Sequence, residues 1–250
     1  MYDDLDRPPL SSTALSRALA PEGWRVEVLA ETGSTNAVVA ARARADEPPG
    51  LVVVAEQQNA GRGRLDRSWV SPPRAGLTFS VLLRPDLPAS RRAWLPLWAG
   101  TAVALALAEQ AGVDARLKWP NDVLVGGRKL CGLLAEVPVE GMVVLGIGLN
   151  VTTRRDELPP GPVTSLQLEG ASTTDRAILL KAMLRRLADQ LSARDPDAYR
   201  RLSATLGQRV RVELPDGTSR EGVAEQVDDD GRLVVDGAAY AAADVVHLRS

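Results

Sequence analysis

The feature that most restricts the fold is a pair of apolar segments with different periodicities. The segment LVVVAEQQ, residues 51–58, opens with five consecutive apolar residues, most of them β-branched, which predicts a strand buried on both faces. Residues 94–111 are apolar nearly all round a helix, which predicts a core helix. Because each element needs cover on every side, we expect an α+β domain in which helices pack on a mixed sheet.

Other segments fit the same class. We expect strands at 24–31, 76–85, 116–125, 128–137 and 141–151, and helices at 37–45, 173–193 and 199–206. From Gly207 onward, short β segments alternate with Asp-Gly turns, which is typical of a small barrel. The predicted organisation is therefore a sheet-and-helix domain over 1–206 followed by a β-barrel over 207–250.

Composition and charge exclude several classes of protein. The net charge of −2 argues against broad, sequence-independent binding to nucleic acid, which needs surplus cations. With one cysteine, Cys131, the chain has no internal disulfide and no cysteine-based zinc site, and Ser-His-Asp catalysis would depend on one histidine, His247. No apolar run approaches a membrane span, and the acidic, proline-containing N-terminus is unlike a signal peptide, so we expect a cytoplasmic protein.

The stretch GRGRLDRSW, residues 61–69, places three arginines and two glycines just after the buried strand. A solvated basic turn, a nucleic-acid contact and a clamp for a small anion all remain open from the residues. Ligands in α/β folds gather at strand ends, glycines let the backbone approach an anion, and arginines offer forked donors. No Walker A pattern occurs, so the segment is not a P-loop.

The segment KWPNDV, residues 118–123, interrupts an expected strand. Pro120 cannot donate to a sheet ladder, so it predicts an irregularity beside two charged residues. Lys118 and Asp122 could bind phosphate and help place Mg²⁺ there. An ordinary surface turn is the alternative, since Pro-Asn-Asp suits turns.

The segment GGRKLCG, residues 126–132, carries a lysine on a strand. Strand alternation predicts that Lys129 and Cys131 share the inner face, opposite Arg128 and Leu130. An inward lysine is costly unless it meets an anion; the alternative is an edge lysine that discourages aggregation. We interpret Cys131 as a packing residue.

The segment from Gly146 to Asn150 places glycines on an expected buried strand. This predicts that another backbone or a ligand lies close by, with Asn150 as a polar group at the end of the strand.

In their order along the chain, these motifs closely resemble those of the biotin protein ligases (biotin–[acetyl-CoA-carboxylase] ligases). The resemblance is dense over residues 24–155. It rests on GSTN (33–36), EQQNAGRGRLDRSW (56–69), GLTFSVLLRP (76–85), KWPNDV (118–123), RKLCGLLAE (128–136) and GIGLNV (146–151). It implies a class II synthetase-like, biotin ligase fold with a C-terminal SH3-like barrel.

The resemblance also implies a two-step reaction. Biotin, the substrate, would attack the α-phosphate of Mg·ATP to give biotinyl-5′-AMP and pyrophosphate. A lysine of a biotin carboxyl carrier protein of an acyl-CoA carboxylase would then take the biotinyl group and release AMP. Such chemistry requires preorganised positive charge rather than a protein nucleophile, which suits a chain with one histidine and one inert cysteine.

Site residues follow from the same resemblance. The catalytic residues implied are Lys129, Arg64 and Lys118. Biotin would be bound by Ser34, Thr35, Asn36, Gln58, Gly61, Arg62, Gly63, Arg64, Lys129 and Gly132. ATP would be bound by Arg62, Arg64, Trp69, Lys118, Asn121, Lys129 and Asn150, with Asp122 as a magnesium ligand. Trp69 is the residue that would stack on adenine; an unassigned tryptophan would otherwise be a core residue.

The sequence departs from the family pattern at two positions. Cys131 stands where alanine is expected, and Arg74 where glycine is common. We expect residues 61–72 to be mobile without ligand and ordered by biotin or biotinyl-AMP, closing the site to water. Arg67 has no assigned role.

Alternative functions are a lipoate–protein ligase of the same fold, a non-catalytic biotin-binding module and a nucleic-acid-binding module. KWPND with RKLCG favours biotin over lipoate. The presence of all four expected cations, Arg62, Arg64, Lys118 and Lys129, argues against an inactive enzyme. About 23 residues precede the first expected strand, too few for a winged helix-turn-helix, so we expect no DNA-binding domain and no nucleic-acid or membrane partner. We expect a monomer or weak homodimer.

Overall fold

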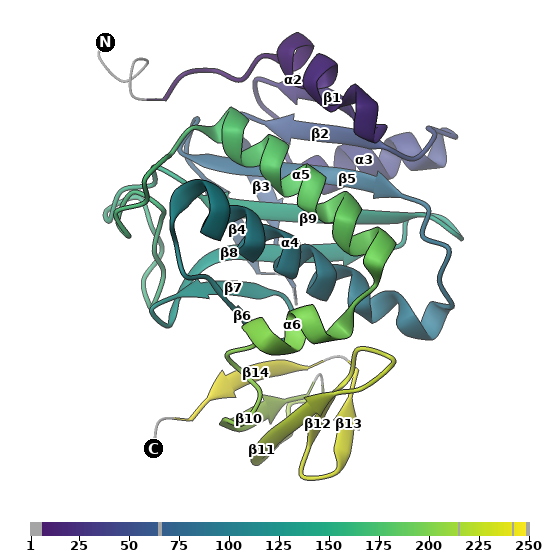
Figure 1. Ribbon diagram of the computed structural model, residues 1–250, viewed down its shortest axis with the longest axis vertical. Helices are drawn as coiled ribbons and strands as arrows, with labels where there is room; N and C mark the ends of the chain where they lie inside the picture. Colours follow the sequence, from purple (N-terminus) through teal and green to yellow (C-terminus); the bar gives the residue numbers. More distant parts are fainter. Residues whose placement is uncertain (1–6, 65–66, 215, 242, 249–250) are drawn as a thin grey trace.

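A seven-stranded mixed sheet forms the centre of the protein (Figure 1). The computed structural model describes residues 7–64, 67–214, 216–241 and 243–248. The strand order across the sheet is β1 (Arg25–Leu29), β2 (Leu51–Ala55), β5 (Gly76–Leu83), β9 (Val143–Asn150), β8 (Arg128–Glu136), β7 (Asp122–Val125) and β6 (Arg116–Lys118). Strands β1 and β2 are parallel, and the other neighbours are antiparallel. This sheet confirms the mixed topology expected from the sequence.

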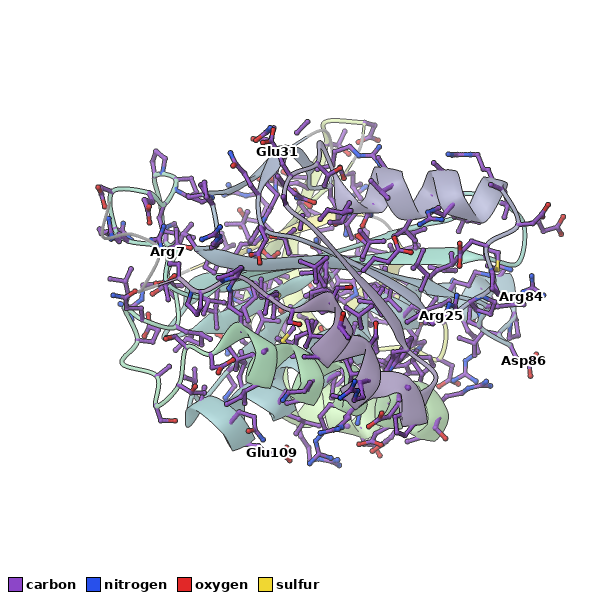
Figure 2. All side chains as sticks on the ribbon, turned by 90° about the horizontal axis from the view of Figure 1, so that it is seen from above. Arg7, Arg25, Glu31, Arg84, Asp86 and Glu109 are labelled. Carbon is purple, nitrogen blue, oxygen red and sulfur yellow. The ribbon has the colours of Figure 1, made fainter. Side chains whose placement is uncertain are left out.

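Helices cover one face of the sheet, and a helix with a hairpin covers the other. On the first face lie α2 (Ser12–Leu19), α4 (Trp94–Ala111) and α5 (Arg176–Ala193); on the second lie α3 (Thr35–Arg44), β3 (Gln58–Arg62) and β4 (Ser68–Ser71). Figure 2, seen from above, shows α3 on the opposite side of the sheet from α2 and α5. Short 3₁₀ turns, Ala20–Glu22 and Ala89–Ala93, connect the layers.

Alternate residues of the central strands fill two cores. On β2, Val52 and Val54 pack with the α4 and α5 side, whereas Leu51 and Val53 pack under α3. This is the burial on both faces that the β-branched run predicted. Helix α4 begins and ends at the residues expected for it, and it is buried on nearly every side. Its Trp94 and Trp98 rings stack 5.7 Å apart within the helix-side core.

Some local expectations were wrong. Residues 116–125 are not one strand, because a turn at residues 119–121, with a cis Trp119–Pro120 bond, separates β6 from β7. The arginine-rich stretch is largely a β3–β4 hairpin rather than a free loop. The last helix, α6 (Pro196–Leu202), begins earlier than predicted because Asp195 caps it and proline follows at the first turn. Helix α2 had not been predicted.

The chain ends in a second, smaller antiparallel sheet. Its strand order is β13 (Ala238–Tyr240), β12 (Leu233–Val235), β11 (Ser219–Val227), β10 (Arg209–Glu213) and β14 (Asp244–His247). Among the described residues β13 and β14 do not pair, so the predicted barrel is seen as a five-stranded sheet without closure.

Hydrogen bonds dock this C-terminal sheet onto the larger one. Trp94 Nε1 donates to Asp229 O at 3.0 Å, and Trp119 Nε1 donates to Gly231 O at 3.2 Å. Thr205 Oγ1 lies 3.1 Å from His247 Nε2 and also accepts from the Trp119 backbone N–H. The two indole N–H groups and the histidine are thereby satisfied across the interface.

None of the helices in the described part of the chain combines the length and the apolar character that a bilayer-spanning helix needs.

The histidine at this interface predicts a pH dependence of stability. Burial, together with the nearby Lys118 charge, lowers the pKa of His247 from 6.5. The unfolded chain therefore binds this proton more readily than the folded protein, and stability should fall as the pH drops below about 6.5. In His247→Gln, which can still contact Thr205, the urea midpoint should depend less on pH between about 5 and 7.5. Equal pH slopes for both proteins would contradict the assignment.

Candidate active site

A cavity of about 230 Å³ opens on the α3 side of the sheet. Its walls come from the start of α3, the β3–β4 hairpin, the middle of β8 and β9, the turn at 119–121 and strand β14. Both sheets therefore contribute to one cavity, and the hairpin that carries the arginines forms one side of it.

Glycines form the floor of this cavity. Gly132 of β8 pairs across the sheet with Gly148 of β9, and Gly146 lies on the same face. A Cβ added at Gly148 would overlap the Trp69 ring, and one at Gly146 would overlap the Asn36 amide. Only the absence of side chains lets these two groups reach the sheet. The expected close neighbours of the β9 glycines are thus an indole from the hairpin and an amide from α3.

Polar groups gather at the end of the cavity next to α3. Gln58 Oε1 accepts hydrogen bonds from Thr35 N at 2.7 Å and from Thr35 Oγ1 at 3.0 Å. Asn36 Nδ2 donates to Glu136 Oε2 at 2.6 Å, and its Oδ1 accepts from Ser80 Oγ at 2.6 Å. Thr35, Asn36 and Gln58 are all buried, so this network fixes their orientations.

Ser80 was not predicted as a site residue. It is fully buried on β5 and lies 2.7 Å from Thr35 Oγ1 as well as beside Asn36. A signal was present in the sequence, because GLTFSVLLRP is apolar apart from its hydroxyl residues in the strand interior. Buried hydroxyl groups need partners, so a serine at an apolar position indicates a polar neighbour.

Five cations border the cavity: Arg62, Arg64, Arg67, Lys118 and Lys129. Arg62 Nη2 lies 3.3 Å from Glu136, the carboxylate that Asn36 contacts, whereas the other four lie toward β7 and β14. The Lys129 ammonium lies 5.9 Å from the centroid of the Trp69 ring and 2.6 Å from Asp122 Oδ1, an ion-pair distance without hydrogen-bond geometry. The Asp122 carboxylate therefore acts as a counter-ion inside the cavity.

Burial shifts the ionisation of two of these cations, Lys118 and Arg64. The pKa of Lys118 is lowered, chiefly by burial and also by the Lys129 charge, while Asp122 opposes the shift. Burial likewise lowers the pKa of Arg64, which the Asp244 carboxylate partly offsets. Desolvated cations that repel one another favour an anionic ligand between them.

The predicted shared face of Lys129 and Cys131 was wrong. Strand β7 pairs Val123 with Cys131 but Leu124 with Lys129, so Leu130 is an extra, bulged residue. Lys129 therefore faces the cavity, whereas Leu130 and Cys131 both lie in the helix-side core. Burial raises the pKa of the Cys131 thiol, which keeps it protonated and agrees with a packing role.

Arg67, which had no predicted role, pairs with the C-terminal sheet. Its Nη2 lies 2.5 Å from Asp244 Oδ2 on β14, and Arg64 Nη2 donates to Ala243 O at 3.3 Å. Residues 243 and 244 thus hold two arginines at the tip of the hairpin. Residues 65 and 66, within the segment expected to move, lie outside the described residues.

Most of the predicted site residues meet in this cavity, and two do not. The residues that line it are Ser34, Thr35, Asn36, Gln58, Arg62, Gly63, Arg64, Trp69, Lys118, Asn121, Asp122, Lys129 and Gly132. Gly61 instead allows the hairpin to close, because a Cβ there would overlap the Trp69 carbonyl. Asn150 donates through Nδ2 to Thr164 O at 3.0 Å, so it anchors the following loop.

A resident metal has little support in the donor set. Within the described ranges, no group of three or more His, Cys, Asp or Glu residues could hold a metal ion. Asp122 is a single carboxylate already beside Lys129. One carboxylate suits a magnesium ion that arrives with a nucleotide, since Mg²⁺ commonly takes one or two protein carboxylates plus phosphate oxygens.

Sequence comparisons place the chain among known proteins. Residues 28–150 match the model of the biotin/lipoate A/B protein ligase family, and residues 205–247 match the biotin protein ligase C terminal domain. A biotin–[acetyl-CoA-carboxylase] ligase from Mycobacterium tuberculosis is 44% identical, over 97% of this chain and 97% of that protein. A bifunctional ligase/repressor from Bacillus subtilis is 33% identical over 76% of this chain, which covers 62% of the relative.

Solved structures agree with these matches. The biotin protein ligase from Aquifex aeolicus, in complex with biotin and ATP, superposes with a TM-score of 0.75 at 27% identity, covering 90% of this chain and 99% of that one. The biotin protein ligase from Leishmania major in complex with biotinyl-5-AMP superposes with a TM-score of 0.62 at 25% identity, covering 90% and 98%.

The glycine floor predicts the effect of one added methyl group. Gly148→Ala should displace the Trp69 ring and lower the free energy of unfolding by about 1–3 kcal/mol, as overpacking does. Displacement of the Trp69 ring should also change the tryptophan fluorescence of the folded protein. This change should be absent when Gly148→Ala is made in a Trp69→Phe variant. Gly33→Ala is the matched control, since its nearest neighbour would be Ala60 Cβ at 3.9 Å. If the two alanine variants unfolded alike, the floor would not require glycine at 148.

Proposed function

Because the chain belongs to the biotin protein ligases, within the biotin/lipoate A/B protein ligase family, we propose that it attaches biotin to a carrier protein at the expense of ATP. The acceptor is a lysine of the biotin carboxyl carrier domain of an acyl-CoA carboxylase. The observation that carries this proposal is one cavity with a neutral polar end at α3 and a cationic end at β8. Such a cavity suits a small acid that must meet a triphosphate.

The first step forms the mixed anhydride biotinyl-5′-AMP. A carboxylate oxygen of biotin attacks the α-phosphorus of Mg·ATP, and the bond to the β-phosphate breaks to release pyrophosphate. Two anions must approach each other, and charge accumulates on the leaving group. Lys129 and Arg64 would hold the reacting oxygens, and Lys118 would neutralise the departing phosphates. The lowered pKa values of Lys118 and Arg64 mark cations that gain from such a partner.

Biotin would lie with its ureido ring at the α3 end. Ser34, Thr35, Asn36 and Gln58 offer donors and acceptors there, already oriented by their mutual hydrogen bonds. Gly132 and Gly63 leave room beside the cationic end, and Arg62 would contact the carboxylate. Gly61 would act through the closure of the hairpin rather than by contact.

The nucleotide would occupy the side of the cavity nearest the hairpin. Trp69 would stack on adenine, and Asn121 would contact the nucleotide from the turn between β6 and β7. Asp122 would bind the magnesium that enters with ATP, after Lys129 turns toward phosphate. Asn150 would support the site by holding the loop that contains Thr164.

In the second step, the amine of the carrier lysine attacks the biotinyl carbonyl and forms an amide. The bond between that carbonyl and AMP breaks, AMP leaves, and the amine loses a proton to solvent. A reaction that consumes ATP and modifies a carboxylase fits the cytoplasm. We also propose that the chain acts as a monomer or weak homodimer and without a nucleic-acid partner.

The decisive experiment follows the mass of an apo carrier domain incubated with the protein, ATP and Mg²⁺. With biotin, the carrier should gain one biotinyl group; with lipoate in its place, it should not. A gain with lipoate alone would identify a lipoate–protein ligase, and no gain with either would refute the proposed activity.

Lys129→Ala should reduce biotinyl-AMP formation by about 100- to 1,000-fold, the usual loss when a preorganised charge is removed. Retained adenylation would remove the role of Lys129.

Ligand should also protect the hairpin. Trypsin cleaves after arginine, and Arg62, Arg64 and Arg67 lie on the segment proposed to close over biotinyl-AMP. Cleavage there should slow about 10-fold with biotin and ATP, because an ordered segment is a poor protease substrate. Cleavage after the exposed Arg220 on β11 should not change and serves as the control. Equal rates with and without ligand at the three hairpin sites would contradict closure.

A further inference from the structure

The β3–β4 hairpin depends on how its two ends are held. The chain leaves the sheet at Glu56, after β2, and returns to it at Gly76, where β5 begins. Between these points lie Arg62, Arg64 and Trp69, so the two stems set where the hairpin that carries these cavity groups leaves and rejoins the sheet. In Figure 1, β2 ends and β5 begins at the same edge of the sheet, next to the start of α5.

One arginine contacts both stems. Arg176, the first residue of α5, places Nη1 2.5 Å from Glu56 Oε2 and 3.4 Å from Gly76 O. Its side chain is 5% exposed and that of Glu56 is 9% exposed. Beyond the end of β4, the backbone N–H of Arg74 donates to the Glu56 carbonyl at 2.7 Å. The base of the hairpin is thus closed by a buried ion pair and a backbone bond.

The N-terminal segment completes this closure from outside. Leu10 N donates to Glu56 Oε1 at 2.6 Å, and Arg176 Nη2 donates to Pro8 O at 2.6 Å. Each partner of the ion pair is therefore also hydrogen-bonded to the same short segment. Arg7 extends the segment to Glu157 at 2.7 Å, at the end of the molecule opposite Arg84 and Asp86 (Figure 2).

A buried ion pair resists displacement of either partner. If either charge moves, the other is left unpaired in an apolar interior, which is costly. Neither Glu56 nor Arg176 lines the catalytic cavity, so neither is placed to touch a substrate. Their contacts instead fix where the hairpin leaves and rejoins the sheet.

We propose that Glu56 and Arg176 are positioning residues for biotin adenylation. They clamp the stems of the β3–β4 hairpin and so hold Arg62, Arg64 and Trp69 against the glycine floor. The proposal rests on the ligase activity proposed above. It also gives the N-terminal segment a role, because residues 8–10 complete the clamp about the pair.

Substitution of Glu56 or Arg176 should lower kcat as well as kcat/KM, because the misplaced groups act in the reaction and not only in substrate binding. Displacing a catalytic group by about 1 Å can cost about 100-fold in rate. Glu56→Gln and Arg176→Gln should each lower kcat/KM for biotin-dependent pyrophosphate release by at least about 10-fold, with kcat sharing in the loss. The double variant Glu56→Gln/Arg176→Gln leaves no lone buried charge, so it keeps the test valid if a single variant fails to fold.

The experiment pairs kinetics with hydrogen exchange on the full-length protein. Amides of β3 and β4 should exchange at least about 10-fold faster in the variants, whereas those of β5 and β9 keep the parental protection. Leu187→Ala, in the buried face of α5 away from the hairpin, is the control for lost stability. It should lower stability while leaving kcat/KM near the parental value, measured well below its unfolding temperature.

The outcomes separate the two proposals. Faster exchange confined to the hairpin together with reduced kcat/KM supports positioning. Parental kinetics in the folded double variant, or exchange that rises equally in β5 and β9, overturns it. If the parent itself releases no pyrophosphate with biotin and ATP, the ligase activity fails, and unchanged hairpin exchange would then separately refute the clamp.

Discussion

The structure depends on the absence of side chains at three positions of its central sheet. Both faces of β9 must be covered, and its leucines and isoleucine meet that need on the helix side. On the other face, Gly146 and Gly148 leave a shallow floor, extended by Gly132 on β8. Because an indole and an amide descend into this space, α3 and the hairpin stand off from the sheet at a distance that encloses a cavity.

Charge is the second organising element. Five cations border the cavity, and burial lowers the pKa of two of them, Lys118 and Arg64. Two carboxylates, Asp122 and Asp244, offset part of the repulsion between these cations from different sheets. The arrangement needs no nucleophile from the chain, because adenylation requires stabilised charge and close approach. It also explains how the C-terminal sheet belongs to the site: Ala243 and Asp244, at the start of β14, hold the arginines at the tip of the hairpin.

The sequence predicted what local periodicity controls and missed what distant contacts control. The limits of α4 were correct because eighteen apolar-rich residues carry their own helical signal. The face of Lys129 was correct, but that of Cys131 was not, since a bulge depends on the register of β7, which no local pattern reveals. Asn150 finds Thr164 and Arg67 finds Asp244 only after the chain folds, so their partners could not be read from spacing. The motifs located the cavity because most of their polar and charged residues line it.

The position of the one thiol has a practical consequence. Cys131 is fully buried in the helix-side core, and its raised pKa keeps it in the unreactive, protonated form. A cysteine introduced on the exposed surface of the hairpin would therefore be the sole site open to maleimide chemistry. The native chain can therefore carry a single spectroscopic probe on this hairpin, with no background labelling to remove.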